Sequence, residues 1–236
     1  MSRSLVGQNT TVPLIELSNI SHDYNNGAGR ISVLRGVDLS VGQNEIVAVM
    51  GPSGCGKSTL LSILGLFLTP TSGSYRALGR NLLALNRSEQ SEFRREFIGF
   101  VFQSCNLIEN TTVYENLEFP LIYAGVKRGE RQGMIKETLK RVNLLHRLHH
   151  PSNLLSGGEQ QRVAVARSLV NNPKIILADE PTGQLDRENS QLIMSQFEEL
   201  VLDGNMAVII VTHDPAVADR CHRIYFLEDG AIRSTR

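Results

Sequence analysis

The chain has 236 residues, 41% of them hydrophobic, and its 24 Lys and Arg residues balance its 24 Asp and Glu residues, so the formal net charge is zero. This size allows one large domain or a domain with a subdomain, and the neutral balance argues against nucleic-acid binding as the main task. The three cysteines, Cys55, Cys105 and Cys221, lie far apart without metal-ligand spacing, which is typical of free thiols in a reducing compartment.

Secretion and membrane insertion are not indicated by the hydrophobic pattern. Residues 1–11 are polar and contain no apolar core of signal-peptide length. The longest apolar runs, Leu60–Leu68 and Met206–Val211, are too short to cross a bilayer. We therefore predict a soluble, cytosolic protein.

The first ordered elements are predicted to be strands. Residues 1–13 read as a loose tail, and strands are expected at Leu14–Leu17 and Ile31–Val41. Between them lies a turn-rich stretch at 25–29. Tyr24 stands just before this turn, where an ordinary half-buried tyrosine at a strand end is one interpretation.

A glycine-rich loop follows the apolar run Glu45–Met50 and precedes the helix predicted over Lys57–Gly65. The loop matches G-x-x-x-x-G-K-[ST], which in a strand–loop–helix context forms a phosphate cradle of backbone N–H groups at a helix N-terminus. Lys57 would neutralise β- and γ-phosphates, and the Ser58 hydroxyl would ligate Mg²⁺. The alternative, a glycine turn before a buried helix, is disfavoured because pattern and context agree. The loop residues are Gly51, Pro52, Ser53, Gly54, Cys55, Gly56, Lys57, Ser58 and Thr59.

The chain after this helix alternates between short strands and helices. A turn at 70–73 leads into a strand at Ser74–Leu78, and a polar, charged helix is predicted over Ser88–Glu96. The apolar run Phe97–Phe102 is a predicted strand that ends at Gln103.

Two consecutive helices are then predicted without a strand between them. Capping-box spacing from Thr112 to Glu115 starts the first, which runs to about Ala124. The second covers Gly129–Leu145, where Ile135, Leu139, Val142 and Leu145 recur with helical periodicity. Helices in succession indicate a helical subdomain inserted into an α/β core.

Three histidines near the end of this second helix, His146, His149 and His150, have helical spacing. The spacing invites a metal site, but no cysteine or carboxylate set lies nearby. Cationic side chains also suit a helix C-terminus, so we do not expect a metal site there.

The stretch Ser156-Gly157-Gly158 opens another helix, continued over Gln161–Val170. A hydroxyl, a flexible backbone and a helix N-terminus make a second anion site, although a simple N-cap is the alternative. Two phosphate-binding helix starts in one chain suggest two chains that share nucleotides across an interface.

The last third of the chain supplies acidic groups at a strand end. The apolar strand 175–178 runs into Asp179 and Glu180. Asp179 suits the support of Mg²⁺, and Glu180 could polarise an attacking water. A helix at 186–202 follows, then a strand at 206–211 that ends in Thr212-His213. A short helix at 214–220 and a closing hairpin, 223–228 with 231–233, complete the chain.

These motifs together resemble the ATP-binding subunit of ATP-binding-cassette (ABC) transporters, in the family's order and over nearly the whole chain. The matching parts are the loop 51–59, Gln103, Leu155–Gln160, Ile175–Glu180, Gly183–Asp186 and His213. A narrower similarity, to subunits of macrolide-, lipoprotein- and antimicrobial-peptide-type exporters, is carried by Phe100–Gln103, Tyr114–Val126 and Ala178–Leu185.

The resemblance implies a single ABC ATP-binding domain with an α/β fold. Its P-loop NTPase core, a mostly parallel sheet flanked by helices, would span about 14–103 and 172–236 together with an N-terminal antiparallel β-subdomain. The inserted α-helical subdomain would span about 104–171.

The resemblance also assigns roles to single residues. Tyr24 would stack on adenine, Gln103 would ligate Mg²⁺ and sense the transmembrane partner, and His213 would contact the γ-phosphate. Ser156 and Gly158 would contact the γ-phosphate of a nucleotide held by the opposite subunit, and Asp186 would couple the two sites. Asp179 would support Mg²⁺, Glu180 would act as the catalytic base, and the loop 51–59 would hold phosphates and Mg²⁺.

Three positions depart from the common family pattern. Cys55 stands where serine is common, Gln184 stands where asparagine is common in the closest relatives, and Leu66–Leu68 is unusually apolar. None removes a catalytic group, so an active ATPase is expected. The apolar stretch suits packing better than a partner-facing surface. Cys55 predicts sensitivity to thiol reagents, because cations and helix N-termini favour thiolates, although a thiol buried in the loop is the alternative.

The leading interpretation is a transport ATPase that binds ATP and Mg²⁺, pairs head-to-tail with a second copy and drives a transmembrane permease. It would lie on the cytoplasmic face of the inner membrane and export or extract a drug, peptide or lipoprotein. Import is the first alternative. A soluble ABC ATPase acting on nucleic acid is less favoured, since the chain lacks coiled-coil or zinc insertions. A non-catalytic regulatory module is disfavoured by the presence of both Glu180 and His213.

Overall fold

The structure is a computed structural model that describes residues 13–25, 27, 29–203 and 206–236. Its largest element is a six-stranded sheet with the order β10-β9-β3-β8-β7-β6, in which all neighbours are parallel except β9 and β10. The mostly parallel sheet predicted from the sequence is therefore confirmed. The strands are β3 (Ile46–Met50), β6 (Ile98–Val101), β7 (Ile175–Asp179), β8 (Ala207–Thr212), β9 (Arg223–Glu228) and β10 (Ala231–Thr235).

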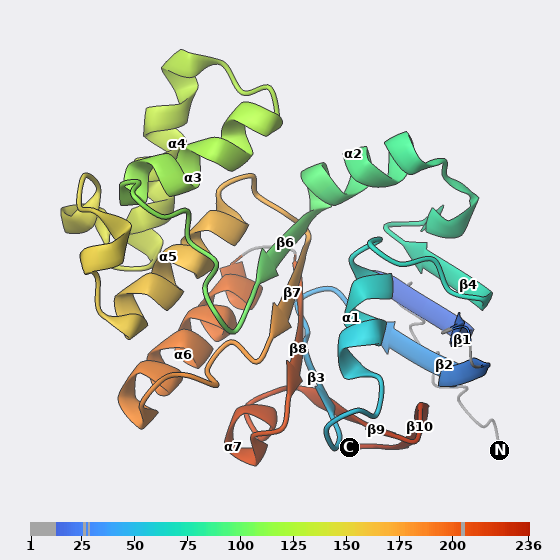
Figure 1. Cartoon of the computed structure of the whole chain (residues 1–236). Coiled ribbons are helices and arrows are strands. Elements are labelled where there is room, and N and C mark those ends of the chain that lie inside the picture. The colour runs from blue at the N-terminus through green and yellow to red at the C-terminus, as the bar shows by residue number, and fades with distance from the viewer. Residues whose placement is uncertain (1–12, 26, 28, 204–205) are drawn as a thin grey trace, which may run out of the picture.

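A second, antiparallel sheet of four strands has the order β2-β1-β4-β5. Figure 1 shows it on the opposite side of the molecule from α3 (Val113–Tyr123) and α4 (Arg128–Arg141). It corresponds to the predicted N-terminal β-subdomain. Its strands are β1 (Ile15–Asn25), β2 (Arg30–Val41), β4 (Ser72–Ala77) and β5 (Arg80–Asn81). The predicted tail lies outside the described residues at 1–12, as do positions 26 and 28 of the predicted turn.

Helices cover both faces of the large sheet because its central strands are apolar on both faces. Val47, Val49 and Leu177 pack with α1 and the small sheet, whereas Ile176 and Ile210 pack with the helices on the opposite face. Figure 1 shows α1 beside β1 and β2, and α5 and α6 on the other side. The helices are α1 (Lys57–Leu64), α2 (Arg87–Phe97), α3 (Val113–Tyr123), α4 (Arg128–Arg141), α5 (Gly157–Leu169), α6 (Arg187–Asp203) and α7 (Pro215–Ala218).

The predicted helical subdomain contains α3, α4 and α5, and the helix start at Thr112 has the expected capping box with Glu115. The last of these helices also packs against the large sheet. A Cβ atom added at Gly99 in β6 would lie 2.3 Å from the carbonyl oxygen of Ser168 in α5. The backbones of α5 and β6 therefore touch, and the boundary at residue 171 stays a prediction.

The prediction of a helix through Leu145 is wrong at its C-terminal end. The helix α4 stops at Arg141, and Asn143 adopts a left-handed conformation with φ 56°. The Leu144 N–H then reaches the carbonyl oxygen of Leu139 at 2.9 Å, which closes the helix with a left-handed turn. Leu144 is buried in the place that the periodicity assigned to Leu145.

Because α4 ends at Arg141, the three histidines do not lie on one face of that helix. His146 lies in a 3₁₀ turn at Leu145–Arg147, and the His149 ring lies 6.2 Å from that of Tyr114. Within the described residues, no three His, Cys, Asp or Glu side chains are grouped in a way that could hold a metal ion. Among those same residues, no helix is both long and apolar enough to span a membrane.

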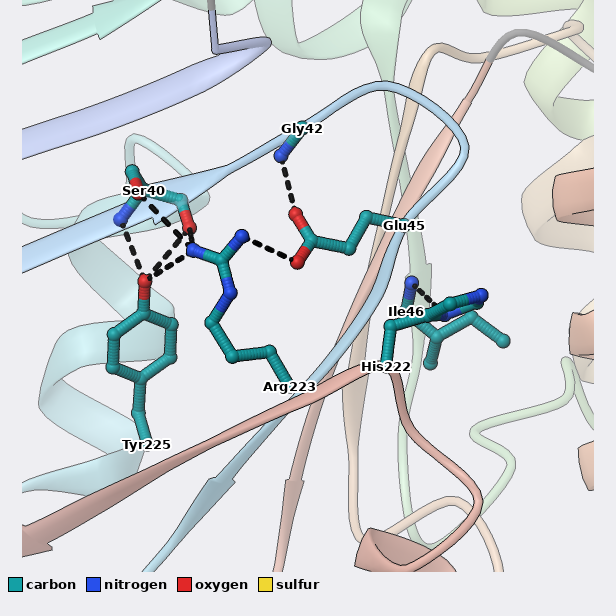
Figure 2. Close-up of polar contacts among 7 residues, drawn as sticks. All are labelled: Ser40, Gly42, Glu45, Ile46, His222, Arg223 and Tyr225. Atoms are coloured by element: carbon teal, nitrogen blue, oxygen red, sulfur yellow. Dashed lines mark hydrogen bonds and ion pairs between the residues drawn. The ribbon is translucent and has the colours of Figure 1, made fainter. Parts of the chain in front are cut away.

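A polar cluster ties the end of β2 to β9, as Figure 2 shows. Glu45 accepts the Gly42 N–H at 2.6 Å and pairs with Arg223 at 2.7 Å. The Tyr225 hydroxyl donates to the carbonyl oxygen of Ser40 at 2.9 Å, and Arg223 Nη1 donates to the Tyr225 oxygen at 3.0 Å. These bonds hold β9 against the chain that leads into β3.

We expect Arg223→Met to lower the free energy of unfolding by about 2 kcal/mol, because Glu45 would lose its cation while its side chain stays mostly buried. The matched control is Arg95→Met, which breaks an exposed pair with Glu92 that is 3.8 Å long. Exposed pairs contribute little, so this control should leave stability nearly unchanged. Urea denaturation of both variants measures the difference in their free energies of unfolding. Equal midpoints would contradict a stabilising role for the Glu45–Arg223 ion pair.

Candidate functional site

The glycine-rich loop connects β3 to α1 and has the curled backbone that its sequence predicts. Gly54 and Gly56 have φ values of 80° and 107°, which favour glycine strongly, and Gly56 is the N-cap of α1. Gly51 is required for space, since a Cβ atom there would lie 2.1 Å from the carbonyl oxygen of Leu227 in β9. The first turn of α1 contains no acidic residue, so its N-terminus is electrostatically open to an anion.

The ammonium group of Lys57 lies over this loop. Its Nζ donates to the carbonyl oxygens of Gly51 and Pro52 at 2.7 and 2.8 Å. Cys55 is buried beside it, with Sγ 3.9 Å from the same nitrogen. The positive charge therefore lies inside the curve of the loop, where an anionic group bound to the backbone N–H groups would meet it.

The loop opens into a cavity of about 360 Å³ that four other segments also line. Gln103 follows β6, Asp179 ends β7 with Glu180 directly after it, Val211 is in β8 and Val33 is in β2. The carboxyl ends of neighbouring parallel strands meet at one sheet edge, which explains how residues so distant in sequence converge. The cavity lining is Val33, Ser53, Gly54, Gly56, Lys57, Ser58, Thr59, Gln103, Asp179, Glu180 and Val211.

The two adjacent carboxylates make this cavity suitable for a cation. Burial raises the pKa of Asp179 above its ordinary value, the neighbouring Glu180 raises it further, and Lys57 acts in the opposite direction. A divalent cation would relieve this repulsion. Ser58, Gln103 and Asp179 supply hydroxyl, amide and carboxylate oxygens, which is the oxygen-only set that Mg²⁺ prefers, so the residues present fit that ion.

Glu180 is held by two residues that follow one another at the end of β8. His213 Nδ1 lies 2.7 Å from Glu180 Oε1, and the Thr212 hydroxyl donates to Oε2 at 3.1 Å. Glu180 itself has φ 45°, an uncommon value for a residue with a side chain. The sequence pattern gave Thr212 no role, although its position at the end of a buried strand, directly before His213, was a usable signal.

The second predicted anion site lies elsewhere in the chain. Ser156 caps α5 and forms a capping box with Glu159, whose carboxylate accepts the Ser156 N–H at 3.0 Å. Ser156 is therefore an N-cap residue, as the alternative interpretation predicted. Other N–H groups of the first helical turn still need hydrogen-bond partners. Neither Ser156 nor Gly158 is among the residues that line the cavity.

The other predicted site residues outside this lining are Tyr24, Gly51, Pro52, Cys55, Asp186 and His213. Tyr24 ends β1 with 43% of its surface exposed, and its ring meets the ring of His22 edge-on at 4.7 Å. Asp186 directly precedes α6 and accepts the backbone N–H of Asn189 at 2.8 Å, as an N-cap residue does.

Comparison with known proteins decides the family. The sequence profile described as "ABC transporter" matches residues 34–183. The ABC transporter ATP-binding protein YknY of Bacillus subtilis, described as uncharacterized, is 44% identical over 219 residues, which cover 93% of this chain and 95% of YknY. The chain belongs to the ABC transporter family. The resemblance read from the sequence is thereby confirmed, and the chain is an ATPase of the ATP-binding-cassette type.

Two further relatives of this ABC ATPase are informative. The macrolide export ATP-binding/permease protein MacB 1/2 of Paracoccus denitrificans is 45% identical over 227 residues. That alignment covers 96% of this chain, which spans only about a third (34%) of MacB 1/2. The structure of the ATP-binding cassette MJ0796, described as a dimer in a post-hydrolysis state bound to ADP and Pi, has a TM-score of 0.86 at 41% identity. It covers 94% of this chain and 97% of its own, which confirms the predicted fold class.

Proposed function

We propose that this chain is the ATP-hydrolysing subunit of a transporter, and that it holds MgATP in the cavity beneath the glycine-rich loop. The observation that carries the proposal is the convergence of Lys57, Asp179 and Glu180 on one cavity of about 360 Å³. Lys57 and the loop backbone bind the β- and γ-phosphates, while Glu180 takes the proton of the attacking water. Ser58, Gln103 and Asp179 would hold Mg²⁺, which would supply charge neutralisation to the phosphates.

The base and the water must be aligned, and the contacts of Glu180 support this. His213 and Thr212 each engage one carboxylate oxygen, so the side chain has little freedom to turn. Most of the His213 side chain is exposed, which leaves its other ring nitrogen free to contact a γ-phosphate. Tyr24 presents a half-exposed ring at the end of β1, which suits stacking on adenine.

A second copy of the chain completes the site. The start of α5, with Ser156 and Gly158, is outside the cavity lining yet carries helix N–H groups suited to an anion. In a head-to-tail dimer this helix start meets the γ-phosphate of the partner's nucleotide, and Asp186 links the two sites. The dimeric state of MJ0796 in its structure supports this arrangement.

The transmembrane partner is a permease, and the direction is export or extraction of a substrate such as a drug, peptide or lipoprotein. The name of MacB 1/2, which joins ATP-binding and permease functions in macrolide export, supports this assignment. The chain then works on the cytoplasmic face of the inner membrane, where ATP is available.

The experiment that tests this function is a steady-state ATPase assay with metal removal. We expect hydrolysis with Mg²⁺, none with excess EDTA, and a loss of about 100-fold or more in Lys57→Ala, because phosphoryl transfer depends on charge neutralisation. Lys140→Ala, which removes an exposed lysine of α4, should behave as wild type. Hydrolysis that survives both EDTA and Lys57→Ala would contradict the proposal.

The loop cysteine predicts a slow, ligand-sensitive inactivation by N-ethylmaleimide. Cys55 is only 7% exposed, so the reagent needs the loop to open, and MgATP should protect by keeping it closed. Burial raises the pKa of Cys105, and it raises that of Cys221 to about 12, so both stay as poorly reactive thiols near neutral pH. Cys55→Ser should resist inactivation, and the idea fails if it is inactivated at the wild-type rate.

A further inference from the structure

The side-chain amide of Asn189, in the first turn of α6, lies between the start of α5 and Asp186. In the proposed function both of these elements face the partner's nucleotide. Its Nδ2 donates to Asp186 Oδ2 at 2.8 Å. On its other side, Arg162 Nη1 in α5 donates to Asn189 Oδ1 at 3.3 Å. The amide oxygen is therefore bonded to α5 and the amide nitrogen to Asp186 before α6, and these two bonds fix the orientation of the side chain.

The same amide rests on the backbone of α5 at its first turn. A Cβ atom added at the buried Gly158 would lie 2.1 Å from Asn189 Oδ1 and 2.4 Å from its Cγ. Any side chain at position 158 would have to push the amide away from Asp186. Close approach of Asn189 is thus one structural reason for a glycine two residues after Ser156.

Arg162 strengthens this contact from one turn further along α5. Its Nε atom is buried and has no hydrogen-bond partner in the described part of the chain. The hydrogen bond between Arg162 and Asn189 is itself part-buried, which limits the access of water to it. The contacts form a continuous series from α5 through Asn189 to Asp186.

We infer that Asn189 is a positioning residue that fixes Asp186 relative to Ser156 and Gly158, so that both elements reach the partner's nucleotide as one unit. This inference rests on the proposed function, in which that unit faces a second copy of the chain. In this scheme Asn189 contacts neither the nucleotide nor the water that attacks it. Its loss should therefore weaken ATP-dependent dimerisation without weakening the binding of ATP to a single chain.

The test uses the Glu180→Gln background, where ATP should be bound with little turnover, and follows dimer formation by light scattering against ATP concentration. Adding Asn189→Ala should raise the ATP concentration for half-dimerisation about tenfold, as expected for the loss of a hydrogen bond to a charged group. Binding of a fluorescent ATP analogue to the monomer should stay within twofold. Gln191→Ala, an exposed residue of the same helix, is the matched control and should change neither quantity.

A second variant distinguishes a loss of Asp186 positioning from a general loss of folding stability. Asn189→Asp places a carboxylate against Asp186, so dimerisation should weaken most at low ionic strength and recover partly as salt screens the repulsion. The helix dipole favours an acidic group in the first turn of α6 and offsets part of the repulsion from Asp186, so thermal stability should change little. A structural defect would not show this salt dependence.

The possible outcomes distinguish a failure of the role inferred for Asn189 from a failure of the proposed dimeric function. If Glu180→Gln dimerises with ATP and both Asn189 variants dimerise at the same ATP concentration, the inference is overturned and the proposed function stands. If Glu180→Gln itself does not dimerise with ATP, the proposed dimeric function is wrong, and the inference is overturned with it.

Discussion

Replacing Glu180 with glutamine should lower ATP turnover by about 10²–10⁴-fold, the range expected for the loss of a positioned general base. Glutamine has the same shape and can still accept the hydrogen bond that Thr212 now gives to Oε2 at 3.1 Å. It cannot take a proton from water. Because Lys57 and the loop are untouched, the variant should bind ATP as tightly as the wild type.

Two measurements check this result. Single-turnover hydrolysis of radiolabelled ATP measures the chemical step directly, and size-exclusion chromatography should show a dimer that forms only with ATP. Glu199→Gln, a change at an exposed position on α6, is the control and should turn over normally. Wild-type turnover in Glu180→Gln would remove this residue from the base role.

Ser156→Arg should abolish nearly all hydrolysis, with a loss of about 100-fold or more, while a single chain still binds ATP normally. The reason is geometric, since Ser156 begins α5 outside the cavity that contains Lys57. An arginine there would block the approach of a partner's phosphates. Titration with a fluorescent ATP analogue, beside an ATPase assay, separates the two quantities.

The loss of the N-cap is the competing explanation and needs its own control. Removing an N-cap costs about 1 kcal/mol of stability, whereas Ser156→Thr keeps a hydroxyl in the same place. We expect Ser156→Thr to retain most of the activity and Ser156→Arg to stay folded. If Ser156→Arg monomers lose ATP affinity as fully as Lys57→Ala monomers, the shared-site arrangement is wrong.

Much of the central fold could be predicted because local signals and tertiary context agree there. The loop 51–56 has glycines where the backbone needs positive φ, an apolar strand before it and an apolar helix face after it. The strand ending at Asp179 was predictable for the same reason, since four consecutive buried residues precede the acid. Strand order then places these ends together, as parallel strands require.

Other features were hidden because they depend on single backbone deviations. β1 runs to Asn25, well beyond the predicted Leu17, since irregular pairing with β2 and the left-handed Asn19 break the alternation of its side chains. The end of α4 depends in the same way on the left-handed Asn143. Asparagine tolerates that conformation, but the sequence does not say which asparagine adopts it.

The candidate site was predicted best where one motif supplies several residues, and worst where contacts join separate motifs. The Thr212–Glu180 hydrogen bond and the Asn189–Gly158 contact each connect residues about thirty positions apart. Neither side chain has a distinctive local pattern. Such contacts become visible only once the strands and helices are placed in space.

The central claim is that two copies of this chain share each ATP site, and mixing two inactive variants tests it most directly. Ser156→Arg retains its own phosphate loop, and Lys57→Ala retains its own α5 start, so a mixed dimer contains one intact composite site. We expect ATPase activity of up to about a quarter of wild type in an equal mixture, since half of the dimers are mixed and each has one of two sites. A mixture no more active than the two variants measured alone would contradict the shared-site account.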